Sequence, residues 1–180
     1  MKPWILAVLL GLISGLPQIY GIKNPEKYGK MVQKFPRSIV WGSFLMILAT
    51  CWFVYYVSLE RVADFQHMKP YLYILFFGVG IGSCIFVRDF LGARGLAVVL
   101  MLLAKLIVDT FRWHDSAWRL VFITWAYFMV IAGIWITISP WRLRDIINWA
   151  TATPQRTKSI CSLKLAFGVL LVILGLTVFR

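Results

Sequence analysis

Charge is scarce in this 180-residue chain, and acidic residues are the scarcest of all. Only 14% of the residues are charged, with 7 Asp and Glu against 19 Lys and Arg, while 61% are hydrophobic. An average soluble domain is about 25% charged. A water-soluble fold of this size could not bury so much apolar surface, so we expect most of the chain to lie in lipid. Because no soluble domain remains, the net charge of +12 does not indicate nucleic-acid binding.

Cysteine is also scarce, and its spacing excludes several kinds of site. Cys51, Cys84 and Cys161 each lie in a separate apolar run, and none belongs to a CxxC motif. A disulfide framework or a zinc site is therefore not expected. The sequence has no CxxCH motif for attaching haem, and no serine, cysteine or carboxylate pair has a credible catalytic partner. We expect neither enzyme activity nor a cofactor.

What the sequence has in abundance is long apolar segments. A helix needs roughly 20 residues to cross the hydrocarbon core, and each crossing must be helical because lipid offers no partner for free backbone groups. We therefore predict an all-α integral membrane protein, a single membrane domain over residues 1–180 with about six transmembrane helices. The predicted segments cover about 4–22, 38–59, 70–87, 91–111, 118–138 and 159–179.

Two parts of this assignment leave an alternative open. The first segment resembles a signal peptide in having one lysine before its apolar run, but no A-x-A-like cleavage site follows, and we expect a retained helix. The third segment, 70–87, is short, and the fourth, 91–111, is bounded by charge at both ends. These two could form a shallow hairpin instead of crossing fully.

The positive charges predict an orientation. The first, third and fifth loops hold eleven Lys and Arg residues, whereas both ends and the other two loops hold six. The positive-inside rule then places the first set in the cytoplasm and both termini outside. We expect a multi-pass protein of the inner membrane whose basic loops contact anionic lipid headgroups. The expected headgroup contacts are Lys27, Lys30, Lys34, Arg142 and Arg144.

Two proline-led segments between apolar runs resemble one another. After Pro25 and after Pro140, apolar residues follow at offsets of three, six, seven and ten, which is the spacing of one helix face. This spacing predicts two short amphipathic helices in the cytoplasmic interface, at 25–35 and 140–151. The apolar residues of the two faces are Tyr28, Met31, Val32 and Phe35, and Leu143, Ile146, Ile147 and Ala150.

The recurrence predicts an internal repeat. We expect Pro36 and Pro154 to end the two interfacial helices, after which the chain returns to the bilayer. The repeated unit is then a transmembrane helix, an interfacial helix and a second transmembrane helix. The chain is expected to form three hairpins, at 4–59, 70–111 and 118–179, of which the middle one has only a short loop.

The stretch GLPQIYGIKNPEKYGKMVQKFPRSIVWG has a recognisable outline, which SPWRLRDIINWATATPQRTKSICSLKLAFG follows more loosely. Each has an apolar helix, a proline-led loop of basic and apolar residues, and then Pro and Arg before a glycine-containing helix. This outline, over about 10–59 and 125–179, resembles the small YjeT-type two-helix inner-membrane proteins. The function of that family is unknown, so the resemblance implies an architecture and no chemistry.

Three polar residues inside the apolar segments are candidates for a functional site. Lys105 and Asp109 are four residues apart and share a helix face. A charge at the bilayer centre costs roughly 2.5–3.5 kcal/mol on insertion scales. The pair could form an ion or proton relay, or Lys105 could extend outward and pair with Asp109 near the membrane boundary. Gln18, beside Pro17, is expected to bond to another helix or to carbonyls freed by the proline.

Glycines spaced four apart predict close helix packing. Gly11 and Gly15 form one such pair, and Gly78 and Gly82, within GVGIG, form the other. GVGIG lacks the strand and helix start that a nucleotide-binding loop requires.

We therefore consider three functions. The leading hypothesis is a non-enzymatic accessory subunit or scaffold of a larger membrane protein complex, which contacts lipids and neighbouring helices. The second is a small oligomeric channel or transporter that uses Lys105 and Asp109, although no carboxylate lies near a segment centre. The third is a cofactor- or pigment-holding membrane protein, for which His67 and His114, both in predicted outer loops, are the weak candidate ligands.

Overall fold

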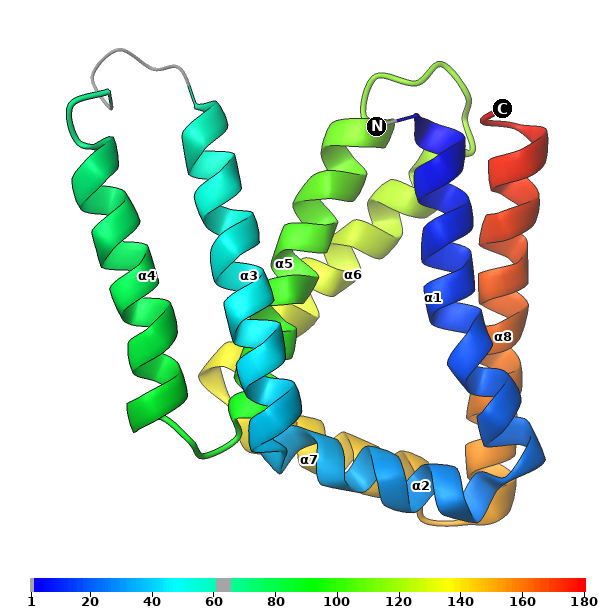
Figure 1. Ribbon diagram of the computed structural model, residues 1–180. Coiled ribbons are helices and arrows are strands. Elements are labelled where there is room, and N and C mark those ends of the chain that lie inside the picture. The colour runs from blue at the N-terminus through cyan, green and yellow to red at the C-terminus, as the bar shows by residue number, and fades with distance from the viewer. Residues whose placement is uncertain (1, 61–65) are drawn as a thin grey trace. The chain divides into compact units, whose positions relative to one another are not determined.

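The computed structural model describes residues 2–60 and 66–180, and every regular element among them is a helix (Figure 1). Six of these helices are long and apolar enough to cross a membrane, which confirms the predicted fold class at that level. The helix predicted at 70–87 has 18 residues, and the one predicted at 91–111 has 21. The six helices are α1 (Pro3–Lys23), α3 (Ile39–Leu59), α4 (Lys69–Phe86), α5 (Leu91–Phe111), α6 (Arg119–Ile138) and α8 (Pro154–Thr177).

Short helices connect two pairs of these spans. Helix α2 covers Pro25–Lys34 and continues into a 3-10 turn, η1, at Phe35–Arg37, and helix α7 covers Pro140–Ala150. Each α-helix begins on a proline, which lacks the N–H that would have no partner in the first turn. Their bounds agree with the predicted 25–35 and 140–151 to within one residue.

The predicted role of Pro154 is wrong. We expected this proline to end the second short helix, but α7 ends at Ala150 and Pro154 is the first residue of α8. The Thr153 side chain accepts a hydrogen bond from the Arg156 N–H and so caps α8. A proline is tolerated in the first turn of a helix, and here the cap before it decides which helix it belongs to. Pro36 lies within the 3-10 turn that follows α2.

The described chain divides into two compact units. Unit 1 comprises residues 1–34, 104–128 and 144–180, and unit 2 comprises residues 35–103 and 129–143. The three hairpins expected from the sequence are not confirmed. Instead, α1 packs along α8 within unit 1, and α3 packs against α4 within unit 2 (Figure 1).

The core of unit 1 is the contact between α1 and α8, and glycines bring the two backbones together. A Cβ on Gly11 would lie 2.6 Å from the Gly168 carbonyl oxygen, and a Cβ on Gly168 would lie 3.0 Å from the Gly15 Cα. Further along the pair, a Cβ on Gly175 would lie 2.9 Å from the Ala7 Cβ. Such close approach is how small residues stabilise helix pairs in lipid, where van der Waals packing replaces the hydrophobic effect.

Unit 2 is built around the first half of α5. A Cβ on Gly42 of α3 would lie 2.6 Å from the Gly92 N atom, so α3 crosses the start of α5 at backbone contact. On the α6 side, a Cβ on Gly133 would lie 2.8 Å from Met101. A buried cluster of α3 and α5 is formed by Ala49, Val99 and Leu102.

Helix α4 contacts the rest of unit 2 along one face only. Gly80 packs against the Thr50 side chain of α3, and the Phe76 ring lies 4.5 Å from the Phe53 ring. Only 6% of the apolar stretch of α4 is buried, compared with 50% of the apolar stretch of α5. Most of the surface of this helix therefore has no protein partner within unit 2.

We expect Gly168→Ala to destabilise the protein by about 1–3 kcal/mol, because the added methyl group would lie 2.8 Å from the Gly11 carbonyl oxygen. The measurement is thermal or denaturant unfolding of the full chain in detergent micelles. Gly78→Ala is the matched control, since no atom lies within 4 Å of its added Cβ, and it should leave stability unchanged or slightly raised. Equal stability of the Gly168→Ala variant and the wild type would contradict the packing described.

Candidate functional site at the junction of α1, α2 and α8

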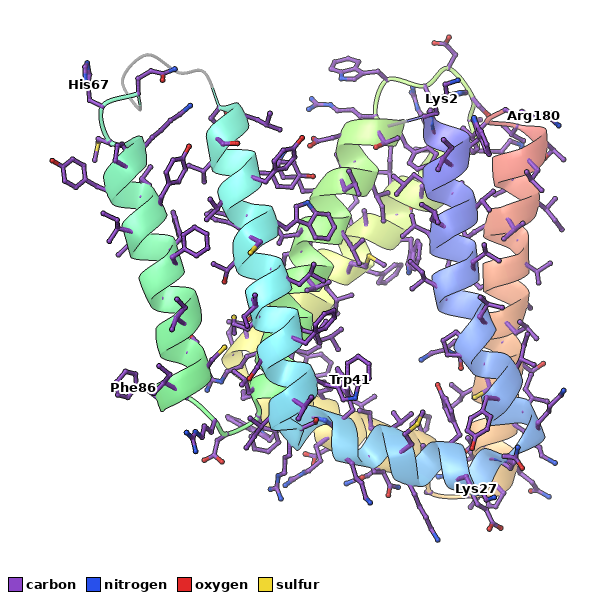
Figure 2. The ribbon with its side chains drawn as sticks, in the orientation of Figure 1. Lys2, Lys27, Trp41, His67, Phe86 and Arg180 are labelled. Carbon is purple, nitrogen blue, oxygen red and sulfur yellow. The ribbon has the colours of Figure 1, made fainter. Side chains whose placement is uncertain are left out.

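Several polar side chains of unit 1 lie where α1 ends, α2 begins and α8 starts. Asn24 alone separates α1 from α2, and its backbone N–H donates to the Tyr20 carbonyl while its own carbonyl accepts from the Tyr28 N–H. Helix α2 then contacts both α1 and α8. Figure 2 labels Lys27 on α2 at this junction. The ends of two apolar spans and one short helix therefore form a common polar region.

Gln18 connects α1 to α2. Its side chain is only 8% exposed, and its Oε1 accepts a hydrogen bond from the Tyr28 hydroxyl at 3.3 Å. Of the two alternatives expected for Gln18, a bond to another helix or to carbonyls freed by Pro17, the structure has a bond to Tyr28 of α2. A buried amide oxygen without a partner would be costly, so this bond fixes how α2 is oriented on α1.

Tyr28 also packs against α8. A Cβ on Gly21 would lie 2.5 Å from the Cys161 Sγ and 3.1 Å from the Tyr28 ring, so the absence of a side chain at Gly21 allows all three helices to meet. Burial raises the pKa of the Tyr28 phenol, and the Cys161 thiol raises it further. The phenol is therefore held in its neutral, hydrogen-bond-donating form.

A second contact joins α2 to the turn that follows α7. The Gln33 Nε2 donates to the Thr151 Oγ1 at 2.8 Å, and Thr151 in turn donates to the Ile147 carbonyl at 2.7 Å. Gly29 is buried at this contact, and a Cβ on it would lie 3.3 Å from the Thr151 Cβ. Helix α2 thus lies against residues more than one hundred positions later in the chain.

Between these elements lies a crevice of about 250 Å³, which we call the α2–α8 crevice. Its lining includes one acidic and one basic side chain as well as hydroxyl and amide groups, and the lining residue Thr157 is only 3% exposed. The lining residues are Pro25, Glu26, Gly29, Lys30, Gln33, Thr151, Ala152, Pro154 and Thr157.

The α2–α8 crevice was not predicted from the sequence. Lys30 was expected to contact lipid headgroups, but Thr151 and Thr157 were not singled out. The available signal was the polar Gln33 on a short helix, and that signal does not indicate a partner 118 residues away.

The predicted intramembrane pair forms at the surface of α5. The Lys105 Nζ and the Asp109 Oδ2 are 2.6 Å apart, and the two side chains are 47% and 53% exposed. Gln18, the third polar candidate, forms its hydrogen bond with Tyr28. The structure therefore brings Lys105 and Asp109 together and places Gln18 in the polar junction.

The two histidines belong to different units. His114 accepts a hydrogen bond at Nδ1 from the Ser116 N–H at 3.2 Å, and its ring packs edge-on against Phe179 at 4.8 Å. His67 is exposed in the turn before α4 (Figure 2). Among the residues that the structure describes, no three or more His, Cys, Asp or Glu side chains are grouped to hold a metal ion.

The remaining predicted residues divide by environment. On α7, Arg142 is exposed and the Arg144 Nη2 lies 2.9 Å from the Asp145 Oδ1. Lys27, Lys30 and Lys34 are exposed on α2.

The two glycine pairs differ in what surrounds them. Gly11 and Gly15 pack on α8, whereas Gly78 has no neighbouring atom within 4 Å of a Cβ and Gly82 has only Phe86 of its own helix, at 4.0 Å. One GxxxG pair thus packs against a helix of its own unit, and the other meets no other helix of unit 2.

Comparison with known proteins gives no relative from which a function could be transferred. No protein-family model, curated protein or solved structure matches this chain.

We expect Tyr28→Phe to destabilise the protein by about 1–3 kcal/mol, because it leaves the buried Gln18 oxygen without its donor. Unfolding of the full chain in detergent measures the effect. Tyr71→Phe removes a hydroxyl from a side chain that is 74% exposed and serves as the control. A Tyr28→Phe variant no less stable than the control would show that the bond has no structural role.

The stability difference between the wild type and Tyr28→Phe should also depend on pH. Since the folded-state pKa of Tyr28 is raised above 10.0, the neutral phenol contributes stability below pH 10.0, which is lost as the pH rises through the folded-state pKa. The difference should therefore be constant from neutral pH to about pH 9 and shrink above pH 10.0. A difference that grows above pH 10.0 would contradict the direction of the pKa shift.

Proposed function

We propose that this chain is a non-enzymatic integral membrane subunit that binds another membrane protein through α4. The observation that carries the proposal is the unpacked face of that helix. Of the six helices long enough to cross a membrane, α4 is the least buried. Only 6% of its apolar stretch is buried, whereas the buried share of the other five is 17% or more. A helix that contributes so little to its own fold is well suited to contact a partner.

The geometry of α4 separates its two faces. Gly80 and Phe76 pack on α3, so that side is occupied within the chain. Gly78 and Gly82 are two residues either side of Gly80, and at 3.6 residues per turn they lie on the opposite side of the helix. The open GxxxG pair therefore faces away from α3.

Lipid contact alone does not account for these glycines. A glycine within a helix is destabilising by roughly 0.5–1 kcal/mol relative to alanine, and acyl chains pack equally well against larger apolar side chains. A second helix does benefit, because the missing side chains let its backbone approach closely. The glycine face is flanked by large exposed apolar residues, which are Ile74, Leu75, Ile81 and Ile85.

The remaining expectations belong to the same proposal. The chain would reside in the inner membrane with both termini outside and with α2 and α7 as amphipathic helices among the cytoplasmic headgroups. The two segments at about 10–59 and 125–179, each a long helix, a short helix and a second long helix, would be copies of a YjeT-like hairpin. The support is the distribution of Lys and Arg and the matching offsets after Pro25 and Pro140.

The channel hypothesis is less well supported. It requires Lys105, Asp109 and Gln18 to face one shared cavity, but the first two form an ion pair at the surface of α5 and Gln18 bonds to Tyr28. The cofactor hypothesis requires available histidine nitrogens, and the Nδ1 of His114 already accepts a backbone hydrogen bond.

Replacing both open glycines should separate the subunit from its partner. We expect Gly78→Val with Gly82→Val to reduce the amount of the complex on a native gel by about tenfold or more, because the branched side chains hold the partner helix away. Phe77→Leu, a change on the exposed surface beside the glycine face, is the control and should retain the complex. Photo-crosslinking from position 85, where the exposed Ile85 flanks the glycine face, followed by mass spectrometry, identifies the partner. Crosslinks only to lipid or to a second copy of the chain would contradict the proposal.

A flux assay tests the channel hypothesis directly. Under our proposal, the protein reconstituted in vesicles carries no ion or proton flux above that of protein-free vesicles, and Lys105→Met changes nothing. Lys164→Met, which alters another exposed lysine of a spanning helix, is the control. A flux that disappears with Lys105→Met and persists with Lys164→Met would favour the channel over the subunit.

A further inference from the structure

The α2–α8 crevice lies at the boundary between the apolar spans and the polar groups of unit 1. Helix α1 ends at Lys23 and α8 begins at Pro154, and the lining comes from α2, the turn after α7 and the first turn of α8. In a bilayer, the ends of spanning helices lie at the level of the headgroups. The crevice therefore opens where phosphate and amine groups of lipids are concentrated.

The crevice carries one positive and one negative charge. Glu26 and Lys30 are four residues apart on α2, so both project from the same side of the helix, and both are exposed. The two ion pairs found in the described part of the chain involve neither residue. A ligand could therefore pair with each charge separately.

Hydrogen-bond donors surround the positive side. The Gln33 amide has two N–H donors, and its bond to Thr151 uses one of them. Pro154 marks the N-terminal end of α8, where the helix dipole favours an anion. These groups, with the Lys30 ammonium, match the acceptor oxygens of a phosphate.

The volume of the crevice and the opposite charges of Glu26 and Lys30 indicate which ligand fits. A volume of about 250 Å³ is smaller than that of pockets for drug-sized molecules, which is about 300–1,000 Å³, but it accommodates a small polar headgroup. We propose that the α2–α8 crevice binds a phosphoethanolamine group, with its phosphate at Lys30 and Gln33 and its ammonium at Glu26. A purely anionic phosphate ligand such as phosphatidylglycerol would leave Glu26 without a cation beside the phosphate.

The test uses the full chain, purified in detergent and incubated with equimolar phosphatidylethanolamine and phosphatidylglycerol, and native mass spectrometry measures the retained lipid. The wild type should retain phosphatidylethanolamine preferentially. Lys30→Gln should lower that retention by about tenfold, because it removes the charge that pairs with the phosphate. Glu26→Gln should bring the ratio of the two lipids close to one while some binding remains.

Lys34→Gln is the matched control, because Lys34 is an exposed lysine of the same helix that does not line the crevice. It should behave as the wild type does. Thermal unfolding of each variant checks that it is folded. We expect all three variants to fold, because Glu26, Lys30 and Lys34 are exposed. Preferential retention of phosphatidylglycerol by the wild type, or an equal loss for Lys30→Gln and Lys34→Gln, would overturn the proposal.

A further arm distinguishes the source of the group. Free O-phosphoethanolamine is titrated into delipidated protein by calorimetry, and its ability to displace the bound lipid is measured. Lipid retention without binding of the free compound assigns the site to a membrane lipid, whereas binding of the free compound alone assigns it to a soluble ligand. Both results support recognition of phosphoethanolamine, and the absence of both refutes it.

Discussion

The backbone contact between α1 and α8 is the constraint on which the rest of unit 1 depends. In lipid, two apolar helices gain little from burying surface against each other, so their association relies on how closely they can pack. The glycines of both helices supply that closeness, from Gly175 at one end to Gly11 and Gly168 in the middle. Once the two backbones are in contact, the end of α1 and the start of α8 are held together, and α2 must lie where the crevice forms.

Polar contacts then specify what packing alone leaves open. Hydrogen bonds of Tyr28 to Gln18 and of Gln33 to Thr151 fix α2 at two points, one on the α1 side and one beside α8. The bond between Tyr28 and Gln18 is partly buried, so leaving either partner unpaired would be costly, whereas the bond between Gln33 and Thr151 is exposed and contributes less. Two such contacts on a helix of 10 residues suffice to define its position and its rotation about its axis.

The parts of this fold that could be predicted from the sequence are those with a local signal. Segment length and hydropathy identify the six spanning-length helices, and the spacing after Pro25 and Pro140 gives the two short helices to within one residue. Helix partners could not be predicted, because residues facing lipid and residues facing protein are equally apolar. Gly11 and Gly78 show this most clearly, since both begin a GxxxG pair and only the first meets another helix of its own unit among the described residues. The crevice was missed for a related reason, namely that its two sides come from distant parts of the sequence.

The pairing of α1 with α8 also has a consequence for biosynthesis. Helix α8 follows every other described helix in the sequence, so it leaves the ribosome after all of them. Until then, α1 is already in the bilayer with its glycine surface covered only by lipid. Because α1 and α8 pack on each other, unit 1 can be completed only after α8 has been synthesised. Any pause in translation before α8 extends the period in which α1 can associate with the wrong neighbour.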